Sequence, residues 1–179
     1  SIDGTFLNQG TALLGNATVA INGLLHNTGT LRLDNGNDFV FSGAITNDGD
    51  IELDSTGSTT DLFISGPVGL SGSGSLTLGS GFSNRVAASG AGASLNQSDG
   101  HTIRGSGTLS VDVTSDGVIA PGLSAGELRF TQDLTLGSNS ELDIQLGGTA
   151  QGTEFDFVDV TGDAILAGVL SVSFMDGFD

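Results

Sequence analysis

The sequence predicts an all-β fold, a parallel β-helix (β-solenoid) with coils of about 20 residues. Three observations support this prediction: a short motif repeats along the chain, turn residues separate short apolar stretches, and helical periodicity is nearly absent. Of the 179 residues, 30 are glycine and 37% are hydrophobic. Because the apolar residues are mainly Leu, Val, Ile and Phe, we expect strands separated by turns rather than a disordered chain.

The repeated motif consists of a turn residue, any residue, glycine, any residue and then an apolar–x–apolar strand. It is clearest at residues 27–33 (NTGTLRL) and 47–53 (NDGDIEL), and weaker copies occupy 8–14, 72–78 and 105–111. The glycines of the five copies are Gly10, Gly29, Gly49, Gly74 and Gly107, separated by 19, 20, 25 and 33 residues. Such spacing predicts stacked coils, since one coil cannot bury its apolar face alone. Glycine is expected at the sharp turns, often with positive φ.

The main alternative fold is a β-sandwich, which is also built from short strands joined by glycine-rich turns. Sandwich strands recur every 8–12 residues or so without a longer period, and the 20-residue period therefore favours the solenoid. We expect regular coils over residues 1–120 and a continuation of the solenoid over 121–179, truncated at the C-terminus. Longer strands are predicted in the second part, at 127–130, 133–136, 141–146, 155–160, 164–166 and 169–174.

The charge balance restricts the partners that the chain is expected to have. There are 21 acidic residues against four arginines and no lysine, so the formal net charge is −17. An acidic surface of this kind repels nucleic acid and anionic membranes. No apolar run approaches the ~20 residues of a membrane span. The absence of cysteine excludes disulfides.

Two sets of polar residues recur in register with the repeat. Asn8, Asn27 and Asn47 each precede a repeat glycine by two residues, and they are interpreted either as a stacked ladder of amides or as turn residues facing water. Asp34, Asp54 and Asp112 each follow a repeat glycine by five residues. Stacked carboxylates about 4.8 Å apart would repel one another, and Ca²⁺ would relieve that repulsion. Alternatively, these aspartates only mark turns and face water.

No residue of the chain is assigned to catalysis. Asp48, Asp50, Glu52 and Asp54 alternate along one stretch and are interpreted as a solvated face, although paired carboxylates can also serve glycoside chemistry. His26 and His101 lack a second histidine or cysteine at metal-ligand spacing. Calcium at the three aspartates is therefore the single cofactor that the sequence suggests, and the chain is expected not to be an enzyme.

Several stretches of the second half resemble a known class of proteins. They are residues 105–109 (GSGTL), 115–128 (SDGVIAPGLSAGEL), 140–144 (SELDI) and 156–162 (DFVDVTG). This style of repeat resembles the passenger regions of bacterial autotransporter-type and filamentous-haemagglutinin-type adhesins, and β-helical surface proteins with a sorting signal of the PEP-CTERM kind. The resemblance covers residues 95–178 well and 1–94 loosely. It implies a right-handed β-helix and a secreted or cell-surface location, and it carries over no catalytic residue.

These observations lead to two functional hypotheses. The first is a structural or adhesive segment of a large secreted or surface protein, which attaches to host or environmental surfaces, glycans or matrix proteins, or acts as a spacer. More of the same long chain is then expected to continue the rod. The second is a polysaccharide-binding or polysaccharide-degrading β-helix, which predicts clustered carboxylates with arginine along one face, for example Arg32 near Asp50 and Glu52.

Overall fold

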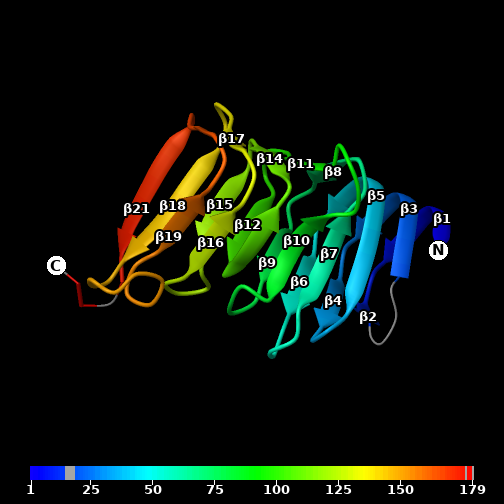
Figure 1. Ribbon diagram of the computed structural model, residues 1–179, viewed down its shortest axis with the longest axis horizontal. Coiled ribbons are helices and arrows are strands. Elements are labelled where there is room, and N and C mark those ends of the chain that lie inside the picture. The colour runs from blue at the N-terminus through cyan, green and yellow to red at the C-terminus, as the bar shows by residue number, and fades with distance from the viewer. Residues whose placement is uncertain (15–18, 176, 179) are drawn as a thin grey trace.

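The strands of this protein stack in parallel along one long axis, as a β-solenoid does. The computed structural model describes residues 1–14, 19–175 and 177–178, and in this part of the chain all regular elements are strands. Every pairing between named strands is parallel. Figure 1 shows the chain advancing from the N-terminal to the C-terminal end of the stack. The predicted solenoid is therefore confirmed, and the sandwich alternative is excluded. None of the described residues forms a helix that could cross a membrane.

One sheet of eight strands runs the full length of the stack, and each turn of chain adds one strand to it. Its order is β2-β4-β6-β9-β12-β15-β18-β21. The strands are β2 (Thr11–Leu14), β4 (Thr30–Asp34), β6 (Asp50–Asp54), β9 (Ser75–Leu78), β12 (Thr102–Gly105), β15 (Val118–Pro121), β18 (Glu141–Leu146) and β21 (Val169–Phe174).

A second sheet of 13 strands covers the rest of the circumference, and it forks. Three long strands, β1 (Ile2–Asn8), β3 (Val19–Asn27) and β5 (Asp38–Asn47), pair along their whole shared length. Beyond β5 the sheet continues as two separate arms. One arm contains β7 (Thr60–Ile64), β10 (Asn84–Ala88), β13 (Gly107–Ser110), β16 (Glu127–Phe130) and β19 (Phe157–Val160). The other contains β8 (Pro67–Ser71), β11 (Ser94–Gln97), β14 (Asp112–Ser115), β17 (Leu134–Leu136) and β20 (Ala164–Ile165).

Each long strand bends at a glycine, and the sheet forks at this bend where the next turn of chain is divided into two strands. Gly4, Gly23 and Gly43 pair in register across β1, β3 and β5, and each has positive φ, so the chain turns a corner without leaving the sheet. In the next turn of chain, β7 pairs with the first half of β5 and β8 with the second half. The two halves are there joined by Ser65 and Gly66, and the coil changes from two strands to three.

The core consists of columns of apolar side chains, one from each turn. In the eight-stranded sheet one column runs through five mutually paired residues, Leu31, Ile51, Leu76, Ile103 and Ile119, all at most 1% exposed. Each such burial contributes about 1.5–3 kcal/mol relative to an exposed side chain. The strands predicted at 127–130, 141–146 and 169–174 agree with β16, β18 and β21 to the residue, and the other three are one or two residues shorter than predicted.

The repeat glycines stack as predicted, but for a different reason from the one expected. Gly10, Gly29, Gly49 and Gly74 lie one above another, and none of them has positive φ. A Cβ on Gly49 would overlap the carbonyl oxygen of Gly29, well inside the 3.0 Å that real Cβ atoms keep. Gly29 and Gly74 stand in the same relation to the glycine of the preceding turn. Glycine is needed here because successive turns of backbone approach too closely for a side chain.

The fifth copy of the motif does not belong to this column. Gly107 begins β13 and pairs with Leu128 in the other sheet, so interpreting residues 105–111 as the next stacked copy was wrong. Thr102 pairs with Ser75, which places His101 level with Gly74. The sequence copy was misleading because three-stranded coils contain three turns, any of which can carry the same Gly-x-apolar pattern.

Replacing Gly49 by alanine tests this close approach. We expect Gly49→Ala to lower the free energy of unfolding by about 3 kcal/mol, because the added Cβ must push two turns of backbone apart. Gly10→Ala is the matched control, since a Cβ at Gly10 meets nothing within 4 Å and its φ is not positive. Urea unfolding followed by circular dichroism measures both variants. Equal losses in the two variants would contradict the explanation.

Candidate functional site

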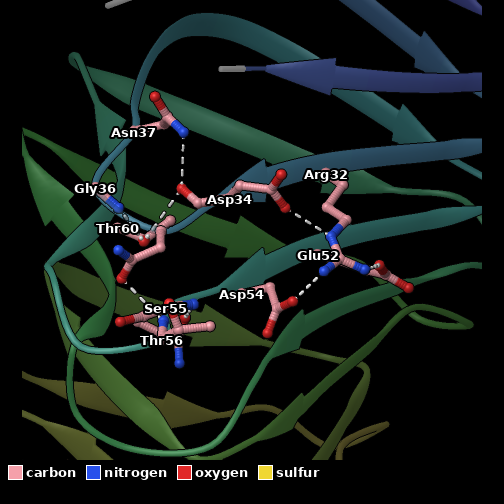
Figure 2. Close-up of polar contacts among 11 residues, drawn as sticks. Arg32, Asp34, Gly36, Asn37, Glu52, Asp54, Ser55, Thr56 and Thr60 are labelled. Carbon is pink, nitrogen blue, oxygen red and sulfur yellow. Dashed lines mark hydrogen bonds and ion pairs between the residues drawn. The ribbon is translucent and has the colours of Figure 1, made fainter. Parts of the chain in front are cut away.

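The predicted pair of stacked aspartates exists, and an arginine lies between the two side chains. Asp34 and Asp54 are paired residues at the ends of β4 and β6. The Arg32 Nε donates to Asp34 Oδ1 at 2.8 Å, and its Nη2 donates to Asp54 Oδ2. Glu52 approaches Arg32 Nη1 at 3.9 Å. Figure 2 shows the guanidinium between these carboxylates. Hydrogen bonding to Asp34, followed by the charge of Asp54, raises the pKa of Arg32 above its usual range.

The turns that follow these two strands are bound to each other by hydrogen bonds. Asn35 Oδ1 accepts from the backbone N–H of Thr56 at 2.9 Å and of Ser58 at 2.7 Å. The Gly36 N–H donates to Thr60 Oγ1 at 3.1 Å (Figure 2). These bonds fix the turn after Asp34 against the turn after Asp54, so the two carboxylates stay at their stacked spacing. A positive charge nearby is therefore needed to offset their repulsion.

The third predicted ligand lies elsewhere. Asp112 begins β14, in an arm of the 13-stranded sheet, where its carboxylate accepts from the Asp133 N–H at 3.4 Å. The structure therefore brings Asp34 and Asp54 together and leaves Asp112 apart from them. Among the described residues, no three His, Cys, Asp or Glu side chains are grouped so as to hold a metal ion. Arg32 supplies the positive charge that the sequence assigned to calcium, and a calcium ion at Asp34 and Asp54 stays a prediction.

The other three arginines also bind carboxylates, and two of them join neighbouring turns. Arg85 donates through Nε and Nη2 to the two oxygens of buried Asp61, both at 2.7 Å. Arg129 contacts Asp159 at 3.0 Å and Glu127 at 3.1 Å, and its guanidinium lies 4.3 Å from the ring centre of Phe82. Arg104 lies 3.6 Å from Asp50. Arg32 lies near Glu52, as predicted. The arginine that contacts Asp50 is Arg104, and not Arg32 as expected.

Asp48 and Asp50 border a polar groove on the outside of the solenoid. The groove has a volume of about 340 Å³ and is lined by Asp48, Gly49, Asp50, Ser73, Gly74, Ser75, Thr102 and Arg104. The Asp48 carboxylate accepts from the Ser73 backbone N–H at 3.0 Å, and His26 lies 3.6 Å from its other oxygen. The Ser73 N–H bond is the main reason why the pKa of Asp48 lies below its usual range. Asp48 precedes β6, while Asp50, Glu52 and Asp54 lie within it, half-buried.

Behind this groove, inside the corner, the predicted asparagine ladder is present. Asn8 Nδ2 donates to Asn27 Oδ1 at 2.7 Å, and Asn27 Nδ2 donates to Asn47 Oδ1 at 2.7 Å. Each amide also donates to a backbone carbonyl of the following turn, namely Thr30, Asp50 and Ser75. All three asparagines are buried. The interpretation as a ladder is therefore confirmed, and the alternative of water-facing turn residues is wrong.

Sequence reasoning missed the residue that ends the ladder. Thr46 pairs with Ser71, so the position after Asn47 in the column is Gly72, which has no side chain. The ring of His101, from one turn further on, reaches this gap, and its Nε2 lies 3.0 Å from Asn47 Nδ2. His101 is fully buried. A signal was available: in residues 101–104 (HTIR) the histidine occupies the place that glycine holds in 74–77 (GSLT) and 117–120 (GVIA).

The polar column continues beyond the histidine with other side chains. Gln97 Nε2 donates to the His101 carbonyl at 2.6 Å, and Ser115 Oγ donates to Gln97 Oε1 at 2.8 Å. Ser140 Oγ then donates to the Ser115 carbonyl. All of these residues are buried. The column of seven polar residues, Asn8, Asn27, Asn47, His101, Gln97, Ser115 and Ser140, is called the corner column below.

Comparison with known proteins gives no family assignment. No protein-family model matches the chain, and no curated protein or solved structure shows significant similarity to it. The functional argument therefore depends on the geometry described above.

The corner column makes a testable contribution to stability. We expect Asn27→Ala to lower the free energy of unfolding by about 3 kcal/mol. The substitution leaves one side-chain N–H of Asn8 and the side-chain oxygen of Asn47 buried without their present partner. Asn22→Ala is the control, since Asn22 also bonds to neighbouring turns, through Asp3 and Ser42, but is exposed. The control is expected to lose less than about 0.5 kcal/mol in the same urea titration. A loss as large for Asn22→Ala would show that the buried position has no special role.

Proposed function

We propose that this chain is a structural or adhesive segment of a large secreted or cell-surface bacterial protein. It forms part of a rod that either acts as a spacer or mediates attachment to a surface. It has no catalysis of its own in this proposal. Its partners are environmental or host surfaces, glycans or matrix proteins.

The observation that carries the proposal is the unbroken bonding between successive turns. The eight-stranded sheet extends from β2 to β21 without a missing strand, and the corner column binds turn to turn through buried side chains. Side-chain bonds of this kind hold neighbouring turns in a fixed register. A stack of this construction resists bending and carries load along its length, which suits a spacer or an adhesive stalk.

The outer surface also fits attachment better than binding of an anionic polymer. All four arginines of the chain contact carboxylates, so their charge is already balanced within the protein. What remains on the outside is a net negative surface with many hydroxyl and amide groups. Such a surface repels anionic polymers and hydrogen-bonds to neutral ones.

An adhesion assay tests this function directly. Beads coated with the chain are allowed to settle on surfaces carrying neutral glycans, matrix proteins or minerals, and the force needed to detach them is measured. We expect detachment forces above those of beads coated with an unrelated protein of similar negative charge on at least one of these surfaces. Detachment forces equal to the control on every surface, together with cleavage of a glycan by the chain in solution, would contradict the proposal.

A second candidate function is binding of a neutral polysaccharide, favoured by the groove at Asp48, Asp50 and Arg104. The groove combines carboxylate acceptors, a guanidinium donor and the hydroxyls of Ser73, Ser75 and Thr102. This is the mixture of donors and acceptors that sugar hydroxyls satisfy. The acidic pair disfavours glycans that carry carboxylate or sulfate groups.

Calorimetric titration with neutral oligosaccharides tests the groove. We expect Asp50→Asn to weaken any binding by about 10-fold, because a charged hydrogen-bond acceptor is lost. Asp159→Asn is the matched control, since Asp159 also contacts an arginine but lies in the other sheet. Affinity for anionic glycans, or an equal loss in both variants, would exclude the groove as the binding site.

A further inference from the structure

The hydrogen bonds of the corner column determine which nitrogen of the neutral His101 ring carries the proton. Asn27 accepts from Asn8 and donates to Asn47, so the Asn47 side-chain oxygen is an acceptor and its amide nitrogen a donor. One N–H of that amide is directed to the Ser75 carbonyl, and the other faces the histidine. The His101 Nε2 must therefore accept, and the proton of the neutral ring must be on Nδ1. The Nδ1 atom is buried and has no hydrogen-bond partner among the described residues.

Protonation of this ring is incompatible with its present hydrogen bond to Asn47. The charged imidazolium donates from both nitrogens, so its Nε2–H would point at the N–H group of Asn47. The ring is fully buried, and the negative charge of Asp48 favours its protonated form. Asp48 gives weak compensation, because it is partly exposed and already accepts bonds from Ser73 while lying beside His26. The groups around His101 from β5 and β11, Asn47 and Gln97, are uncharged.

His101 also lies where the solenoid changes shape. Between Asn47 and His101 lies a turn of chain that contains Gly72 and Gly74 and contributes no side chain to the column. The imidazole crosses this turn, and its contact with Asn47 joins the ladder of β1, β3 and β5 to the later part of the column. The same turn is the first in which the long strand is divided into β7 and β8. Breaking the contact between His101 and Asn47 separates the two halves of the corner column at the junction between two-stranded and three-stranded coils.

We propose that the contact between His101 and Asn47 is an acid-sensitive latch: protonation of the buried imidazole breaks it and loosens the two-stranded N-terminal turns from the rest of the rod. The proposal goes beyond the structural and adhesive function, because it adds a condition under which the rod opens. A surface protein with such a latch would loosen at this junction when its surroundings become acidic.

The direction of the pH effect follows from the burial of the ring. Burial lowers the pKa of His101 from 6.5 to about 4, while the charge of Asp48 opposes this shift. Between these two values the opened chain binds more protons than the closed one, so closure is favoured above pH 6.5 and becomes less favoured as the pH falls toward 4. With those two pKa values, the opening equilibrium rises by about 100-fold between about pH 7 and about pH 4.

Hydrogen exchange read by mass spectrometry tests the latch on the full chain at about pH 7 and about pH 4, after correction for intrinsic exchange rates. In the wild type, acid should accelerate exchange most at the amides around the junction, including those of Ser75 and Thr102. The variant His101→Gln places a neutral acceptor at similar reach, and we expect it to lose the roughly 100-fold acid response. Carboxylates that titrate in the same range act on both proteins and cancel in the comparison.

His26→Gln is the matched control, because it makes the same substitution at the other histidine, which is half-buried and lies outside the corner column. We expect it to keep the acid response of the wild type. An equal acid response in His101→Gln and wild type would overturn the proposal, and so would an acid response centred on the C-terminal turns. Should His101→Gln fail to fold, nitrogen NMR of the wild-type ring decides: a proton on Nδ1 at neutral pH supports the latch, whereas a proton on Nε2 or a charged ring overturns it.

Discussion

Every feature of this protein depends on one constraint, the parallel stacking of successive turns at the spacing of hydrogen-bonded strands, about 4.8 Å. Parallel pairing in register places each residue directly beneath its counterpart in the turn above. Apolar residues thereby form continuous core columns such as that of Leu31 and Ile51. The same proximity leaves no room for a Cβ between turns of backbone at Gly29 and Gly49, so glycine is required there even though φ is ordinary.

Stacking has the opposite consequence for charged residues, because it places like charges together. Asp34 above Asp54 would be unfavourable alone, and Arg32 between them turns the repulsion into a bridge between two turns. Arg85 does the same with buried Asp61, where its two donors match both carboxylate oxygens. An acidic chain with four arginines has thus used each of them on its own carboxylates, and this leaves the outer surface negative and rich in hydroxyl groups.

Amides are suited to the interior corner because a stacked asparagine both donates and accepts, so that a column of them satisfies itself without charge. Asn8, Asn27 and Asn47 do so as long as the turns are alike. Where the coil acquires a third strand, the column changes to His101 and then to Gln97 and Ser115. The histidine side chain reaches the Asn47 amide from one turn further on, but it brings a titratable ring into a buried site where Asp48 is a weak counter-charge.

The sequence by itself determined the solenoid and most strand positions in the second half, because a fixed spacing of about 20 residues and an alternating apolar pattern are local properties of the chain. It also placed Asn8, Asn27 and Asn47 in register, but the structure was needed to show that their amides form a ladder. Only the tertiary structure decided which residues fill the column after Asn47 and that Arg32 lies between Asp34 and Asp54. The reason is that the later repeat glycines are separated by 25 and 33 residues, and such unequal gaps do not fix a register. Gly107 therefore matched the motif, although His101 is the residue level with Gly74 in the stack. A side chain that spans two turns or bridges two carboxylates is defined by distance in space, and sequence spacing does not specify that distance.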